Sequence, residues 1–211
     1  MKQYQKMYKG ERFNSISHLL GVVLGCIGVI LLLIVAIEKG DVLKIVGFSV
    51  YGLMLVILYS VSTIYHSTKG KLKDLFRQLD YVSIYLMIAG SYTPITLLTL
   101  KGTLGWTLFG IVWALAVVGI VQEILIGKKT RKYSIFIYLL MGWLVLIAIK
   151  PLVNSLPMGG LLWLVAGGLS YTFGVGFFLQ DEKYPYFHGI WHLFVLAGSI
   201  CQFISLYVYV A

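Results

Sequence analysis

The sequence predicts an all-α integral membrane protein with seven transmembrane helices. Of its 211 residues, 59% are hydrophobic and only 12% are charged. A soluble domain carries about 25% charged residues, so this composition argues against a soluble enzyme and rules out a disordered chain. The apolar residues also form continuous runs, such as residues 29–35, rather than alternating with polar ones. A transmembrane β-barrel needs that alternation and is therefore disfavoured.

Seven segments are long enough to cross a bilayer, which takes about 20 mostly apolar residues in a helix. In chain order they are residues 16–37, 45–66, 79–100, 103–126, 133–149, 159–179 and 187–211. The first follows a polar stretch and precedes no small-residue cleavage site, so we interpret it as an uncleaved span. The fifth is the shortest. Because the connectors are short, we expect one seven-helix domain over residues 1–211.

The distribution of Lys and Arg predicts the orientation of the helices. When the regions outside the seven segments are counted alternately, 13 basic residues fall on one side of the membrane and 4 on the other. By the positive-inside rule, the N-terminus is cytoplasmic and the C-terminus external. The net charge of +9 is then a topology signal that also suits anionic head groups. We expect a multi-pass protein of the cell (plasma) membrane, with membrane lipid as its partner and no nucleic-acid binding.

Polar side chains from four of the predicted helices converge on one layer of the membrane. His18 opens the first span, His66 ends the second, and His188 and His192 open the seventh. Asp80 opens the third span at the same depth. With the predicted topology, all five lie near the cytoplasmic face. A carboxylate within a membrane is costly and is a candidate functional residue by default.

The spacing of two of these histidines favours a metal site. His188 and His192 are four residues apart, which places both rings on one face of a helix. His66 can add a third nitrogen from another helix, and three nitrogens plus water form the open tetrahedral site typical of catalytic Zn²⁺. Asp80 is then available as general base. Ser62, one turn before His66, can hold Asp80 or the group that is cleaved.

Several polar residues have a simpler interpretation. Histidines are common at membrane interfaces, and an i, i+4 pair alone does not establish a metal site; Asp80 in the same layer favours one. Glu123 closes the fourth span, where a carboxylate can face water. We interpret Asp181 and Glu182 as part of a solvated loop.

At these positions the sequence resembles the haemolysin III family, the bacterial branch of the progestin and adiponectin receptor group, in a superfamily that also contains alkaline ceramidases. The resemblance covers essentially the whole chain. The motifs that carry it are Glu11-x-x-Asn14-x-x-x-His18, Ser62-x-x-x-His66, Asp80 and His188-x-x-x-His192.

This resemblance implies zinc held by His66, His188 and His192, with Asp80 on the zinc-bound water and Ser62 beside it. It also implies the same cytoplasmic N-terminus. The role of the motif that ends at His18 would be structural or substrate-gating.

Three classes of function fit these features. The first is a zinc-dependent membrane hydrolase, similar to a ceramidase, that cleaves the amide bond of a lipid. The second is a haemolysin that permeabilises membranes. The third is a receptor-like regulatory protein with a structural zinc. A retinal-binding protein is excluded because no predicted span contains a Lys for a Schiff base.

Overall fold

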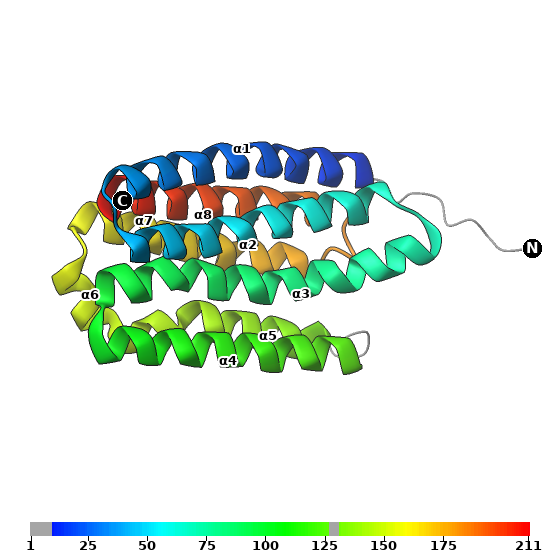
Figure 1. Cartoon of the computed structure of the whole chain (residues 1–211). Coiled ribbons are helices and arrows are strands. Elements are labelled where there is room, and N and C mark those ends of the chain that lie inside the picture. Colours follow the sequence, from blue (N-terminus) through cyan, green and yellow to red (C-terminus); the bar gives the residue numbers. More distant parts are fainter. Residues whose placement is uncertain (1–9, 127–130) are drawn as a thin grey trace, which may run out of the picture.

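The computed structural model describes residues 10–126 and 131–211, and every regular element in these ranges is helical (Figure 1). The α-helices are α1 (Glu11–Glu38), α2 (Val42–Ser67), α3 (Gly70–Pro94), α4 (Gly102–Ile126), α5 (Arg131–Trp143), α6 (Ile149–Ser155), α7 (Met158–Phe178) and α8 (Phe187–Tyr209). A π-helix, η1 (Ile95–Leu100), continues α3, and a 3₁₀-helix, η3 (Leu144–Ala148), joins α5 to α6. Together they form seven rods long and apolar enough to cross a membrane, as the sequence predicted.

The rods run side by side in one bundle (Figure 1). α1 packs against α2 and α8, α2 against α3, α3 against α4, and α8 against α7. We call the end of the bundle at which α1, α3 and α8 begin and α2 ends the histidine end. Because the number of rods is odd, α8 finishes at the opposite end from the start of α1 (Figure 1).

The outer surface of the bundle is apolar. Large side chains such as Ile16, Val117 and Leu125 are more than half exposed. A contiguous apolar surface of this kind is unfavourable in water, whereas lipid chains cover it at no cost. The outer surface of the rods is therefore suited to contact with lipid chains.

The first helix starts earlier than the predicted span, at Glu11 instead of residue 16. Its extra turn is polar in sequence, so hydropathy alone does not include it. In the structure Glu11 and Asn14 are buried, because this turn packs inside the bundle beside the start of α8. The additional turn brings both residues to the histidine end.

The third rod changes its winding at Pro94, which has no N–H to donate to the preceding turn. The chain continues as the π-helix η1. Two threonine hydroxyls donate to backbone carbonyls around the proline, Thr93 to Ala89 at 3.0 Å and Thr96 to Tyr92 at 2.9 Å. Side-chain hydrogen bonds of this kind are common near a proline in a membrane helix.

The fifth rod is longer than the predicted span of residues 133–149, because it continues to Ser155. Lys150 and Pro151 interrupt the apolar run in the sequence. In the structure they occupy the first turn of α6. Proline is tolerated there because the N–H groups of a first turn have no partner within the helix.

Candidate metal centre

Three histidines meet at the histidine end of the bundle. His66 comes from the last turn of α2, and His188 and His192 from the first two turns of α8. One ring nitrogen from each lies within 4.8 Å of the others. The Nε2 atoms of His66 and His188 are 3.3 Å apart. Both His66 and His192 are buried, so the cluster is largely shielded from solvent.

Carboxylates fix the rings of two of these histidines. Nδ1 of His66 donates to Oε2 of Glu11 at 2.7 Å, and Lys73 donates to Oε1 of the same carboxylate at 2.9 Å. Nδ1 of His188 donates to Oδ2 of Asp181 at 2.6 Å. An ionised carboxylate can accept hydrogen bonds but cannot donate them. Both rings must therefore carry a proton on Nδ1.

The start of α1 fixes the third ring. Nδ1 of His192 donates to the backbone carbonyl of Asn14 at 3.1 Å and lies 3.3 Å from the Ser17 hydroxyl. The close approach of α1 needs Gly189, which lies between the two α8 histidines. A Cβ atom at this position would come within 2.6 Å of the Phe13 ring.

The protonation pattern suits a cation. Because Nδ1 of each ring donates to the protein, Nε2 is the atom left for a further partner. The Nε2 atoms of His66 and His188 lie 3.3 Å apart, and between two neutral rings this contact needs a cation, because both atoms then carry a lone pair. Metal-binding histidines characteristically donate their other N–H to a carboxylate or a backbone carbonyl, as all three do here. The described residues therefore fit a metal ion, and the three rings can hold one.

The fourth histidine lies against this cluster but outside it. The His18 ring stacks on His192 with centroids 3.5 Å apart and planes 10° apart. The edge of Tyr59 contacts it from another direction, at 5.0 Å between centroids. Its side chain is buried, and neither ring nitrogen has a hydrogen-bond partner in the protein.

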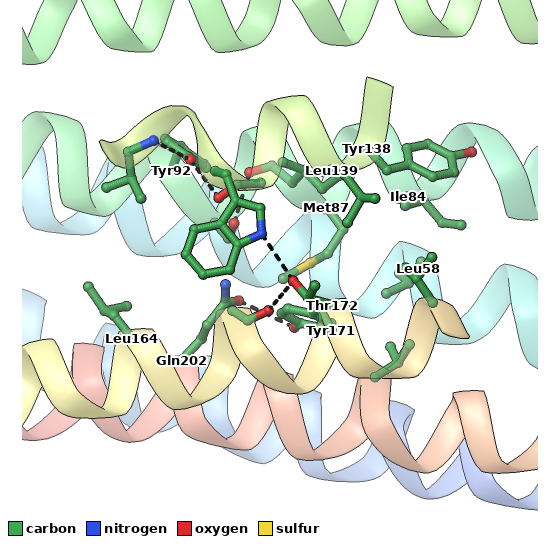
Figure 2. Close-up of a pocket in the computed structure, with 18 of the residues that line it drawn as sticks. Leu58, Ile84, Met87, Tyr92, Tyr138, Leu139, Leu164, Tyr171, Thr172 and Gln202 are labelled. Carbon is green, nitrogen blue, oxygen red and sulfur yellow. Dashed lines mark hydrogen bonds between the residues drawn. The ribbon is translucent and has the colours of Figure 1, made fainter. Parts of the chain in front are cut away.

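An apolar cavity of about 210 Å³ adjoins the cluster. Its polar lining at the histidine end consists of His18, Ser62, Asp80 and His192. Asp80 lies near Ser62 and His188. Figure 2 shows the apolar part of the wall, where Leu58 of α2, Met87 of α3 and Leu139 of α5 surround the cavity.

A second polar group lies deeper in the cavity, on α7 and α8. Tyr171 lies 3.4 Å from Oε1 of Gln202 (Figure 2). It also lies 2.9 Å from the Ser199 hydroxyl, and Trp143 of α5 donates to Thr172 at 3.0 Å. These groups satisfy one another. The cavity is thus polar at the histidine end, apolar along most of its length, and internally hydrogen-bonded where α7 contributes side chains.

The structure brings together the residues that the sequence grouped, because all four histidines and Asp80 meet at one end of the bundle. The interpretation of Asp181 as a solvated loop residue is wrong. Its side chain is only 10% exposed and accepts a hydrogen bond from His188. The contact of Glu11 with His66 was also not predicted. No periodicity links either carboxylate to its histidine, so no sequence signal could have paired them.

Comparison with known proteins places this architecture in a family. The family model described as Haemolysin-III related matches residues 6–203. The chain belongs to that family. It is 44% identical to hemolysin-3 of Bacillus cereus over 211 residues, which span 100% of this chain and 96% of the relative. It is also 44% identical to the hemolysin-3 homolog of Bacillus subtilis over 202 residues, or 95% and 94% of the two chains.

The family extends to animals. The human monocyte to macrophage differentiation factor is 32% identical over 166 residues, covering 76% of this chain and 68% of the human protein. Family membership and the seven apolar rods together make this haemolysin III protein a multi-pass membrane protein.

The contacts of Glu11 and Asp181 lead to a first testable expectation. Glu11→Ala and Asp181→Ala should each weaken zinc binding by about 10–100-fold, because outer partners of metal-binding histidines contribute affinity of that order. Competition of the purified variants with a chelator of known affinity measures the change. Asp74→Ala removes an exposed carboxylate near the same end of α3 and is the matched control. Wild-type affinity in both variants would mean that neither carboxylate supports the metal.

Proposed function

We propose that this haemolysin III protein is a zinc-dependent hydrolase that cleaves the amide bond of a membrane lipid, in the manner of a ceramidase. One observation carries the proposal: a histidine triad suited to a metal lies beside the carboxylate of Asp80 at the polar end of an apolar cavity. Structural zinc sites are normally closed by four protein ligands. Here three nitrogens converge within the described residues, which leaves a position for a reactant.

His66, His188 and His192 would hold the ion. A zinc ion in such a site supplies two forms of activation, since it lowers the pKa of water and polarises a carbonyl. Glu11, Asp181 and the Asn14 carbonyl keep the three rings oriented through their Nδ1 protons. These contacts would hold each Nε2 lone pair towards the site before a substrate arrives.

Asp80 is the base in this proposal. Asp80 belongs to the third membrane-spanning rod, lies near Ser62 and His188, and lines the cavity. It would take the proton of the attacking water and pass it to the amide nitrogen that leaves. The Ser62 hydroxyl would hold the Asp80 carboxylate in position or donate to the carbonyl that is attacked.

The shape and lining of the cavity support a lipid as substrate. On α3 alone, lining residues run from Asp80 to Tyr92, a distance of about 18 Å at 1.5 Å per residue. One water molecule needs a cavity of only about 10–15 Å³. The cavity of about 210 Å³ therefore accommodates a much larger ligand. An acyl chain along the apolar wall would bring its carbonyl carbon to the histidine end.

The proposal predicts that purified wild-type protein carries about one zinc per chain and releases fatty acid from N-acyl lipids. Elemental analysis gives the metal content, and mass spectrometry of a panel of lipid amides and matched esters detects the cleavage. Stripping the metal with a chelator should abolish the release, and adding zinc should restore it. A metal-loaded protein that cleaves no member of the panel would contradict the hydrolase.

The names of the two bacterial relatives favour a second candidate, a protein that permeabilises membranes. A pore needs a polar stripe along the bundle, whereas the cavity here is largely apolar and has its ionisable groups at one end. Ion conductance in pure liposomes that contain the purified protein tests this alternative directly. Conductance that persists after removal of the metal would support it over the hydrolase.

A further inference from the structure

Two of the described residues that line the cavity have buried polar atoms with no hydrogen-bond partner in the protein, Ser62 with one such atom and His18 with two. His18 is 3% exposed, and neither Nδ1 nor Nε2 has a partner in the protein. A buried polar group without a hydrogen bond is destabilising, and an apolar side chain would fill this space without that cost. The imidazole therefore has a use that the protein alone does not reveal.

Its neighbours leave the ring little freedom to turn. His192 stacks flat against one face at 3.5 Å, and Tyr59 approaches at 80° to the ring plane. Nitrogens held in this way are prearranged for a partner in the cavity, which His18 lines together with Ser62 and Asp80. Since His18 is not one of the three grouped metal ligands, its nitrogens remain available to an organic ligand.

We propose that His18 binds an uncharged, hydroxyl-bearing head of the lipid that occupies the cavity, and that it selects such lipids over those without a hydroxyl. A neutral imidazole offers one donor and one acceptor. A hydroxyl group both donates and accepts, so it can pair with either nitrogen, whereas an ester or ketone oxygen only accepts. This inference rests on the proposed function only for which bond of the lipid is cleaved. That a lipid occupies the cavity follows from the size and apolar lining of the cavity and does not require cleavage.

The described lining of the cavity offers no cationic side chain to an anionic head. No Lys or Arg is among the described residues that line it, while Asp80 contributes a carboxylate. Phosphate and sulfate groups are normally recognised by Arg, Lys or helix N-termini. A neutral head next to the histidine cluster is the kind of group that this lining can accommodate.

Two ligands that differ by one hydroxyl test the inference without depending on turnover. Both are non-hydrolysable ketones with a palmitoyl chain, in which a methylene group replaces the amide nitrogen; one head ends in a hydroxyl and the other in a methyl group. Their affinities for the zinc-loaded full chain are measured by native mass spectrometry in detergent. We expect wild type to prefer the hydroxyl ligand roughly tenfold, the order of a buried hydrogen bond.

Variants at His18 assign the preference to its nitrogens. His18→Phe keeps a flat ring for stacking on His192 but has no nitrogen, and it should bind the two ligands equally while retaining zinc. His18→Gln supplies a donor and an acceptor and should restore part of the preference. Tyr51→Phe is the control, because the Tyr51 hydroxyl is also buried and unpartnered but does not line the cavity.

The outcomes separate this inference from the proposed function. A wild-type protein without preference, or a His18→Phe variant with the wild-type preference, would overturn the role of His18. If His18→Phe did not fold, the role of His18 would still be overturned by equal affinities of wild type for the two ligands, or by a His18→Gln variant that binds them equally. A clear preference in a protein that cleaves no lipid would support His18 as a head-binding residue and remove only the hydrolase.

Discussion

His66→Ala, His188→Ala and His192→Ala should each remove most of the zinc that purified wild-type protein carries. Each substitution leaves two ring nitrogens, whereas catalytic zinc sites retain three protein ligands. Among the described residues, no other group of three His, Cys, Asp or Glu side chains is close enough to hold a metal, so no second cluster is expected to replace the one lost. Elemental analysis after size-exclusion chromatography gives the zinc content per chain.

A variant with an equally disruptive change outside the triad makes this result specific. His18→Phe alters a ring that stacks on His192 but is not one of the grouped ligands, so it should keep wild-type zinc. Metal that binds only the folded chain stabilises it, and the three triad variants should therefore also melt at lower temperature than His18→Phe in the presence of zinc. Equal zinc content in wild type and in the three triad variants would rule out the triad as the metal site.

The seven rods could be predicted from sequence because hydropathy and length suffice to identify a membrane span. The ends of two of them could not. Pro151 ends the apolar run of the fifth span, yet in the structure it lies in the first turn of α6. The first turn of α1 is polar in sequence and buried in the structure. Both cases depend on which neighbours cover a segment, and this information is not local in the sequence.

The candidate site also contains residues that the sequence could group and contacts that it could not. The spacing of His188 and His192 is helical, and the predicted ends of the spans put His66 and Asp80 in the same layer, so this grouping needs no tertiary structure. The supporting carboxylates are different. Asp181 lies in the loop before α8, and Glu11 reaches His66 from 55 positions away in the sequence. The packing of α1 against α2 makes the contact of Glu11 with His66, and the path of the loop before α8 makes that of Asp181 with His188.

Asp80→Asn should lower lipid-amide turnover by at least about a hundredfold while zinc content and folding stay unchanged. General bases typically contribute about 10²–10⁴-fold, and an amide cannot take the proton of the attacking water. Asp80 is not among the grouped metal ligands of the described residues, so its loss should leave the triad intact. Turnover and zinc are measured on the same purified sample, with Asp74→Asn as an exposed control on the same helix.

The combination of the two readouts assigns the role of Asp80. Loss of turnover with full zinc identifies it as the base, because the metal alone then fails to complete the reaction. Loss of both would make it a direct ligand, since a neutral amide oxygen binds zinc more weakly than a carboxylate. Unchanged zinc with unchanged turnover would remove Asp80 from the mechanism. The cost of a carboxylate within the membrane would then need another explanation, and the main support for a hydrolase would be lost.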